Sequence, residues 1–349
     1  MRQLLLPANR TLLLAFLLCL APSTVLAQVE NTDTNKSFPT IQAAIDDSGT
    51  DGGDVIDVDP GTYTENVTVD KAVTLNGPNA DTPGNGNRGS EATIKGQVIL
   101  SATGAVFDGF DVSPPQATKN GKGEAIRIGT GGNGPGSGPD NVIVRNNIVR
   151  DFEESGLGEG LDGINAFGGN GSNALSNPTI ANNLVENLDR PSSAGGAAGI
   201  SIQGNVDGAT VEGNTVRDIQ DTKLKFAFGI VVRGSGNTSQ KPKNITVKDN
   251  DVSNITDTSP YHGVGFGVEE RDGSGSIDVT GNRFRNIDFQ VEDKTETLDR
   301  NVLIQNNDFD SIVEASSITV NRRIIFGKIQ AAVDMASSGA TVSAAAGTY

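Results

Sequence analysis

Residues 244–255 read Asn-Ile-Thr-Val-Lys-Asp-Asn-Asp-Val-Ser-Asn-Ile, and the chain repeats this pattern several times. Relative to Asn250, apolar residues stand five and three positions before it and two and five positions after it. The same frame fits six asparagines that lie 25 to 36 residues apart: Asn147, Asn183, Asn214, Asn250, Asn282 and Asn307. The last copy has Val302, Ile304, Phe309 and Ile312 at its apolar positions. Such self-similarity is typical of solenoids, in which each copy forms one coil and the loops vary in length.

The spacing within one copy indicates a strand, a corner and a second strand. Apolar residues at −5 and −3 alternate, which puts both side chains on one face of a strand. The step from −3 to +2 is odd, so the alternation breaks at the asparagine, a residue that tolerates the left-handed backbone angles of a turn. Stacked copies would place the six asparagines in a row, with each side chain able to donate to the next. The alternative is an antiparallel sandwich whose strands are similar by coincidence.

Residues 37–75 precede the first asparagine-centred copy. Apolar residues at helical spacing predict an amphipathic helix over residues 38–48, with Ser37 as its N-cap. Alternating apolar residues then predict strands at 55–58 and 67–75. A short amphipathic helix ahead of the first coil would cover an otherwise bare end of the stack.

Three segments of this opening carry a family resemblance: Phe38-Pro-Thr-Ile-Gln-Ala-Ala-Ile45, Asp54-Val-Ile-Asp-Val-Asp-Pro-Gly-Thr-Tyr63 and Glu65-Asn-Val-Thr-Val69. Together with the asparagine-centred copies, they resemble the pectin-lyase-like right-handed parallel β-helix superfamily, with its PbH1-type repeats. The resemblance covers nearly all of the chain after residue 27. It implies an all-β fold, a right-handed parallel β-helix with an N-terminal amphipathic capping helix. It is less specific for function, because the superfamily includes lyases, hydrolases, esterases and non-catalytic surface proteins.

The two ends of the chain differ from the repeats. Residues 1–27 combine Arg2 and Arg10 with a short apolar run and small residues before Gln28, which predicts a secretory signal peptide of bacterial type. We expect the β-helix domain over residues 28–323. Residues 324–349 repeat the opening, with Ile329-Gln330 matching Ile41-Gln42 and Gly347-Thr-Tyr349 matching Gly61-Thr-Tyr63. We expect the start of a second, truncated β-helix copy there; a C-terminal helical cap is the alternative.

The composition limits the classes of partner. The formal net charge is −16, which disfavours nucleic acid and anionic membranes because both are polyanions. Cys19, the only cysteine, lies in the predicted signal peptide, so the exported chain would have no disulfide. No later segment is long and apolar enough for a transmembrane helix. We expect a secreted, extracellular or cell-surface location.

A second family of strands alternates with the asparagine-centred copies, at residues 125–128, 163–166, 199–202, 229–232 and 263–266. In all but the first, a glycine leads the strand, as expected where the chain turns tightly. Outward positions on and beside these strands form the candidate binding groove: Arg127, Asn165, Gln203, Lys223, Glu269 and Arg271. Arg233, Lys225 and His262 are the candidates for catalysis in the same groove. Solvated surface charge is the alternative for the whole set.

The enzymatic signatures that the resemblance implies are incomplete here. A hydrolase needs two carboxylates that flank the scissile bond, and no Asp pair lies in a matching coil beside His262. An esterase needs an Asp in an Asp-Phe-Ile-Phe-Gly-like segment, whereas Val106-Phe-Asp-Gly-Phe110 predicts an ordinary coil strand. A lyase needs a base, here Arg233 or Lys225, and often calcium to neutralise a uronate carboxylate. The acidic segments 54–59 and 153–162 are candidates for calcium, but their ligand spacing is not diagnostic, so no metal ligand is identified.

We therefore expect a secreted or cell-surface β-helix repeat protein that binds carbohydrate or serves as a structural module without catalysis. Its expected partner is a polysaccharide or a cell-surface glycan. The alternative is a polysaccharide lyase that cleaves a uronate-containing glycan by β-elimination. The sequence does not indicate an oligomeric state.

Overall fold

The structure is a computed structural model of the chain. It describes residues 28–114, 123–129, 138–153, 160–169, 174–190, 196–221, 226–234, 241–257, 263–269, 276–295, 297–318 and 323–346. The predicted signal peptide therefore lies outside the described residues.

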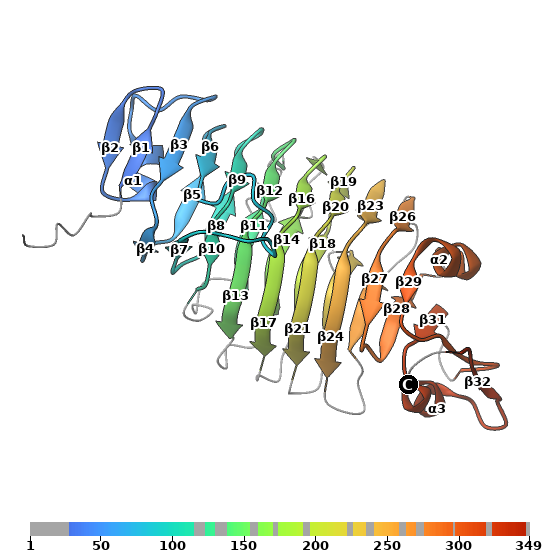
Figure 1. Cartoon of the computed structure of the whole chain (residues 1–349). Helices are drawn as coiled ribbons and strands as arrows, with labels where there is room; N and C mark the ends of the chain where they lie inside the picture. The colour runs from blue at the N-terminus through green and yellow to red at the C-terminus, as the bar shows by residue number, and fades with distance from the viewer. Residues whose placement is uncertain are drawn as a thin grey trace, which may run out of the picture.

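Strands dominate the described chain and line up in three long sheets along one rod (Figure 1). Sheet A consists, in spatial order, of β2 (Lys36–Phe38), β1 (Val29–Asn31), β3 (Val55–Val58), β6 (Thr74–Asn76), β9 (Val106–Asp108), β12 (Ile143–Arg145), β16 (Thr179–Ala181), β20 (Thr210–Glu212), β23 (Ile245–Lys248) and β26 (Ile277–Thr280). Sheet B consists of β4 (Gly61–Tyr63), β7 (Ala92–Ile94), β10 (Asp111–Val112), β13 (Ile148–Glu153), β17 (Leu184–Arg190), β21 (Thr215–Asp221), β24 (Asp251–Asp257), β27 (Arg283–Arg285) and β29 (Asp308–Phe309).

Sheet C consists of β5 (Val67–Val69), β8 (Val98–Leu100), β11 (Gly123–Ile128), β14 (Leu161–Phe167), β18 (Ala197–Gln203), β22 (Ala227–Arg233), β25 (Val264–Glu269), β28 (Phe289–Asp293), β31 (Arg323–Phe326), β30 (Val313–Ala315) and β32 (Val342–Ala344). β15 (Leu175–Ser176) and β19 (Val206–Asp207) form a small parallel pair. The helices are α1 (Ile41–Asp46), α2 (Arg300–Asn306) and α3 (Ile329–Met335).

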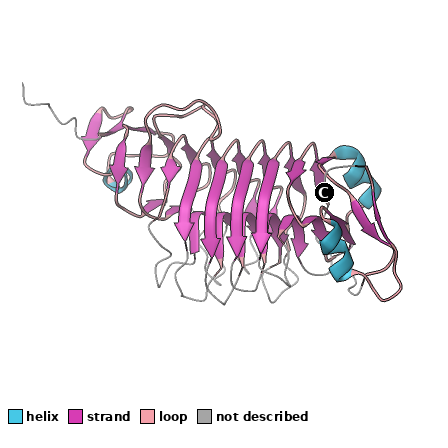
Figure 2. Ribbon diagram, turned by 60° about the horizontal axis from the view of Figure 1, so that its bottom comes forward, coloured by secondary structure: helices cyan, strands magenta, loops and turns pink. Residues whose placement is uncertain are grey.

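The chain visits sheets A, B and C in turn, so each coil contributes one strand to each sheet, as β12, β13 and β14 do. Strands of successive coils pair in parallel, and Figure 2 shows them stacked side by side along the rod. Inward side chains form one continuous hydrophobic cluster that runs through the coils from Val29 to Ile325. The fold is therefore the expected right-handed parallel β-helix, not a sandwich.

The six asparagines form a row of buried and part-buried side chains at the corner between sheets A and B. Asn183 Oδ1 accepts hydrogen bonds from the backbone N–H and the side-chain amide of Asn147, at 3.0 and 3.1 Å. The same pair of bonds repeats from coil to coil as far as Asn307. Before the row begins, Phe110 occupies the equivalent position, donates its N–H to Asn147 Oδ1 at 2.9 Å, and stacks on Phe107. The row satisfies polar groups that would otherwise be buried without a partner.

The left-handed residue of the corner is not the asparagine of the row. Positive φ angles of 55 to 68° fall one residue earlier, at Asn146, Asn182, Gly213, Asp249 and Gly281. A second set, with φ of 51 to 56°, falls four residues after the row, at Asp151, Asn187, Asp218, Asn254 and Asn286. In each corner, an Asn, Asp or Gly therefore adopts the left-handed backbone of the turn, and the Asn that follows it makes the hydrogen bonds between coils.

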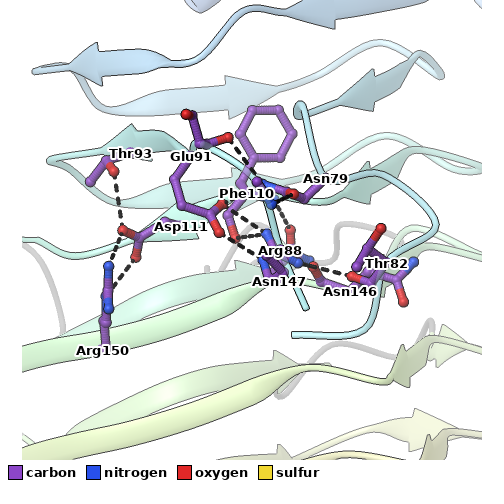
Figure 3. Close-up of polar contacts among 12 residues, drawn as sticks. Asn79, Thr82, Arg88, Glu91, Thr93, Phe110, Asp111, Asn146, Asn147 and Arg150 are labelled. Atoms are coloured by element: carbon purple, nitrogen blue, oxygen red, sulfur yellow. Dashed lines mark hydrogen bonds and ion pairs between the residues drawn. The ribbon is translucent and has the colours of Figure 1, made fainter. Parts of the chain in front are cut away.

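A long connection between sheets A and B, residues 77–91, lies along this corner and is called the strap. Gly84 N donates to Asn182 O at 2.8 Å, and Asn85 Nδ2 donates to Thr215 Oγ1 at 2.8 Å, so the strap reaches β21. A Cβ atom at Gly84 would lie 2.4 Å from backbone atoms of Asn147 and Leu184, so only glycine fits this approach. Arg88 anchors the strap through a bidentate ion pair with Glu91 (2.8 and 2.9 Å) and a bond to Asn146 O (Figure 3).

At the N-terminal end, α1 covers the first coil, as expected. Ile41, Ala44 and Ile45 are buried, while Gln42 pairs with the backbone of Thr68. The N-cap is Thr40, whose hydroxyl accepts from Ala43 N, so the prediction of Ser37 was wrong. Ser37 lies instead in β2, which pairs with β1, and the helix begins four residues later.

At the C-terminal end, the last asparagine-centred copy departs from the predicted strands. Val302 and Ile304 lie in α2, and Val302 is 49% exposed, because the helix buries Leu303 against the open end of the core instead. Asp299 caps α2 and Asn307 ends it, so only the second half of this copy forms a strand, β29. Within residues 323–346, β31 and β32 join sheet C by antiparallel pairing and α3 packs beside them. A second β-helix that starts at residue 324 stays a prediction.

Among the described residues, no helix combines the length and apolar character that crossing a membrane requires.

Candidate functional site

The outer face of sheet C carries side chains in registered rows. Glu124, Asp162, Ala198 and Phe228 form one row, and Arg127, Asn165, Ser201 and Val231 form the next. Phe167, Gln203 and Arg233 form a third. The glycines before the central isoleucines let sheet C pack closely against sheet B. A Cβ at Gly199 would lie 2.3 Å from Val216, and one at Gly229 would lie 2.4 Å from Val252. Both substitutions would push sheet C away from sheet B.

Five of these side chains bind one another across three strands, and with Ser201 we call them the polar cluster: Glu124, Arg127, Asp162, Asn165, Ser201 and Arg233. Arg233 Nη2 donates to both oxygens of Asp162, at 3.0 and 2.8 Å. Its guanidinium must cross β18 to do so, and it can because β18 presents only Ala198 and Ser201 there. The amide of Asn165 bridges the two carboxylates, with 2.8 Å to Glu124 Oε1 and 3.0 Å to Asp162 Oδ2. Arg127 Nη1 completes the cluster at 3.2 Å from Glu124 Oε2.

The polar cluster is shielded from water. Ser201 is fully buried and Arg127 is 7% exposed, while the side chain of Arg233, at the edge of the cluster, is 21% exposed. Burial raises the pKa of Asp162 above its usual value, and the positive charges of Arg233 and Arg127 only partly oppose this effect. As the pH falls, Asp162 would therefore take up a proton at a higher pH than an ordinary aspartate does. That proton would remove the negative charge that pairs with Arg233.

Several hydrogen-bonding groups of the polar cluster have no partner among the described residues. They are Nε and Nη2 of Arg127, Oδ1 of Asn165, Oγ of Ser201 and Nε of Arg233. Nε and Nη2 form one edge of the Arg127 guanidinium, which is the edge that binds two oxygens at once. The Cζ atom of the same guanidinium lies over the Phe167 ring, 4.9 Å from its centroid. Donors, acceptors and an aromatic face in one place are suited to a hydroxyl-rich ligand such as a sugar.

The structure brings together three of the predicted groove residues, Arg127, Asn165 and Arg233. Arg127 and Asn165 face outward but are buried under their neighbours, so they are not solvated, whereas the side chain of Arg233 is 21% exposed. Gln203 lies beside Arg233 in register. Glu269 lies on its other side but forms an ion pair with Lys294. Lys223, Lys225, His262 and Arg271 lie outside the described residues.

Sequence reasoning missed Glu124, Asp162 and Ser201. Glu124 and Asp162 share a signal that could have found them, since each stands directly before the small residue that leads its strand. Ser201 carries no such signal, because its importance comes from the two longer side chains that meet above it.

The calcium prediction receives no support from the described acidic residues. Among them, no group of three or more His, Cys, Asp or Glu side chains is placed to hold a metal ion. Asp54, in the first predicted segment, accepts instead from Asn31 Nδ2 at 2.8 Å and from Asp51 N at 3.1 Å. Segment 153–162 lies largely outside the described residues, so calcium stays a prediction.

Comparison with known proteins gives partial matches. No family model matches the chain. Over 102 residues, or 29% of this chain, it is 35% identical to a protein named cell surface glycoprotein from Methanothermus fervidus. The chain spans 16% of the length of that curated relative. The crystal structure of Dettilon tailspike protein (gp208) is similar over 75% of this chain and 65% of that chain, with 9% identity and a TM-score of 0.26.

Proposed function

We propose that this protein is a secreted or cell-surface β-helix module that binds carbohydrate, without cleaving it, at the polar cluster on sheet C. The observation that carries this proposal is the set of buried donors and acceptors that the described residues leave unpaired. Each buried, unpaired polar group costs about 1–3 kcal/mol. A ligand that paired with several of them would recover part of that cost.

The edge of the polar cluster gives the direction of approach. Exposure rises from Ser201 to Arg233 and Gln203, so a sugar would enter over the third row and reach Ser201 last. The free edge of Arg127 would then take two neighbouring hydroxyls or a sugar carboxylate, and Phe167 would supply an apolar surface.

The proposed location outside the cell has independent support. The relative that shares 35% identity over 102 residues is named a cell surface glycoprotein. The secretory signal peptide that the sequence predicts over residues 1–27 agrees with export.

A polysaccharide lyase remains the second candidate in the sequence, but the geometry supports binding better. A lyase needs a base that takes a proton from the substrate. Arg233 donates twice to Asp162, so its guanidinium is already engaged by that carboxylate. Lys225 and His262, the other candidates, lie outside the described residues.

Retention of the protein by immobilised glycans in affinity electrophoresis tests the proposal. Ser201→Ala is the sharpest variant, because the hydroxyl that it removes has no partner in the part of the chain that the structure describes. We expect an unchanged melting temperature and about five- to tenfold weaker retention, from the loss of one hydrogen bond of roughly 1 kcal/mol.

Arg127→Gln and Arg217→Gln form a matched pair for the same assay. Both remove an arginine that pairs with a glutamate on an outer sheet face, but Arg217 lies on sheet B, away from the polar cluster. We expect only Arg127→Gln to abolish retention. Equal retention of the wild type, Ser201→Ala and Arg127→Gln would contradict the proposal. A rise in ultraviolet absorbance from unsaturated uronate ends would favour the lyase.

A further inference from the structure

A separate pocket opens on the outer face of sheet B, near the ends of β17, β21 and β24. Its volume is about 310 Å³, at the lower end of the range for small-molecule sites. Three coils line it with equivalent residues: Asn187 and Asp189, Asp218 and Gln220, and Asn254 and Thr256. Leu188, part of the hydrophobic core, also lines it.

The lining residues form two parallel rows along the rod. Asp189, Gln220 and Thr256 are direct partners in the register of the three strands. Asn187, Asp218 and Asn254 all have left-handed backbones, with φ of 54, 56 and 54°. The rows therefore repeat at the strand spacing of about 4.8 Å. This regularity suits a ligand made of similar units that runs along the rod, not across it.

The two rows differ in their hydrogen bonds. In the first row, Asn254 Nδ2 donates to Asp218 Oδ1 at 3.0 Å, which fixes both side chains. In the second row, the exposed side chains of Gln220 and Thr256 bond to none of the described residues. The amide of Gln220 and the hydroxyl of Thr256 can each donate and accept a hydrogen bond, and both lie beside the fixed pair of Asn254 and Asp218.

The charge of the pocket restricts the ligand. Among the described residues that line it, two are carboxylates, Asp189 and Asp218, and none is basic. The arginines next to these carboxylates in sequence are already paired: Arg217 donates to Glu186 at 2.8 and 2.6 Å, and the buried Arg190 lies 3.4 Å from Asp221. A carboxylated or sulfated glycan would be repelled from this surface.

We propose that this pocket is a second carbohydrate subsite, selective for a neutral or amino sugar whose hydroxyls pair with Gln220, Thr256 and the carboxylates. It does not depend on the polar cluster, which lies on another sheet and offers arginine donors. One molecule would then present two faces of different charge preference, one along sheet B and one along sheet C.

Affinity electrophoresis of the full chain tests the subsite, with dextran, laminarin, mannan and chitosan oligosaccharide as neutral or cationic probes and polygalacturonate as the anionic one. The variant Gln220→Ala/Thr256→Val removes the two free groups. The control is Thr246→Val, an outward threonine of β23 on sheet A. We expect retention by at least one neutral or cationic probe to weaken about tenfold in the double variant only, as the loss of two modest hydrogen bonds predicts.

A second pair of variants separates this subsite from the polar cluster. Ser201→Ala should leave retention by the neutral or cationic probe unchanged, and Asp189→Asn should newly permit or strengthen retention by polygalacturonate. The proposal is overturned if no neutral or cationic probe retains the wild type. It is also overturned if the double variant behaves like Thr246→Val, or if Ser201→Ala weakens the same probe as strongly as the double variant does.

Discussion

Helices α1 and α3 share the sequence Ile-Gln-Ala-Ala, yet they lie in opposite environments at the two ends of the rod (Figure 1). In α1 both flanking apolar residues, Ile41 and Ile45, are fully buried against the first coil. Their counterparts in α3, Ile329 and Val333, are 44% and 49% exposed, and that helix buries its two alanines instead.

The partners of the two helices explain the difference. The carboxylate of Glu65 accepts from the first two N–H groups of α1. The side-chain amide of Gln42 donates to the carbonyl of Thr68 in β5 and accepts from the N–H of the same residue. Gln330 keeps only the bond within its helix, to Asp334. Helical periodicity alone does not decide which face of an Ile-Gln-Ala-Ala helix is buried. The helix covers the end of the rod only where the strand that follows it binds its first turn.

The largest expected effect tests burial directly. Ile45→Asp should lower the free energy of unfolding by more than about 4 kcal/mol, because it places an unpaired charge in the core. Val333→Asp, at the equivalent position of α3, should change it by less than about 0.5 kcal/mol. Urea denaturation of both variants measures the difference. Similar losses would mean that the exposed face of α3 is covered in solution.

The anchoring of the two ends is the next test. Arg88→Ala should cost about 3–5 kcal/mol, because it leaves Glu91 and the carbonyls under the strap without their buried partner. Arg300→Ala, which removes a more exposed ion pair with Glu314 near α2, should cost at most about 1 kcal/mol. The midpoint of thermal unfolding distinguishes them. An Arg88→Ala protein as stable as Arg300→Ala would show that the strap contributes little.

A smaller effect concerns the helix caps. Thr40→Ala should cost about 1 kcal/mol, because its hydroxyl accepts from Ala43 N at the start of α1. Lys328, at the equivalent position of α3, makes no capping bond through its side chain, so Lys328→Ala should lose only its ion pair with Asp288. Chemical denaturation with matched m-values measures both. A larger loss of stability for Lys328→Ala than for Thr40→Ala would contradict the expectation that α1 is the better capped helix.

The smallest effect appears only at alkaline pH. Burial raises the pKa of Tyr63 to about 12 from 10.0, with Asp59 and Glu65 adding to the shift. Between these values the folded state keeps a proton that the unfolded state has lost, so stability should fall as the pH rises through this window. Tyr63→Phe should remove that part of the fall, although it also loses the bond to Asp59 O. The check is the melting temperature of both proteins at several pH values from 9 to 12; parallel curves would contradict it.

Much of the fold follows from residues that are close in sequence. The alternation around each asparagine predicts two strands and a corner, and the opening predicts a helix before them. In the copy around Asn307, the predicted first strand was wrong, because these residues form α2. That helix buries Leu303 while Val302 faces solvent. A period-two pattern of two residues is too short to separate a strand from a capping helix.

The candidate site was harder to predict, because its contacts join residues far apart in the chain. Asp162 and Arg233 are 71 residues apart and skip an entire coil, so their meeting depends on the small residues of β18 between them. Outward alternation identified Arg127, Asn165 and Arg233 as a face. It could not show that this face is buried, since the neighbours that cover it come from other coils.

The strap has a consequence for the way the rod comes apart. A simple solenoid behaves as a one-dimensional chain of units in which each repeat senses only its neighbours, so its ends can fray independently. By joining residues 77–91 to Asn146, Asn182 and Thr215, the strap couples coils that are not adjacent. Amide hydrogens from β7 to β21 should therefore exchange with one common opening free energy, whereas those beyond β24 should exchange in a graded series toward the C-terminal end.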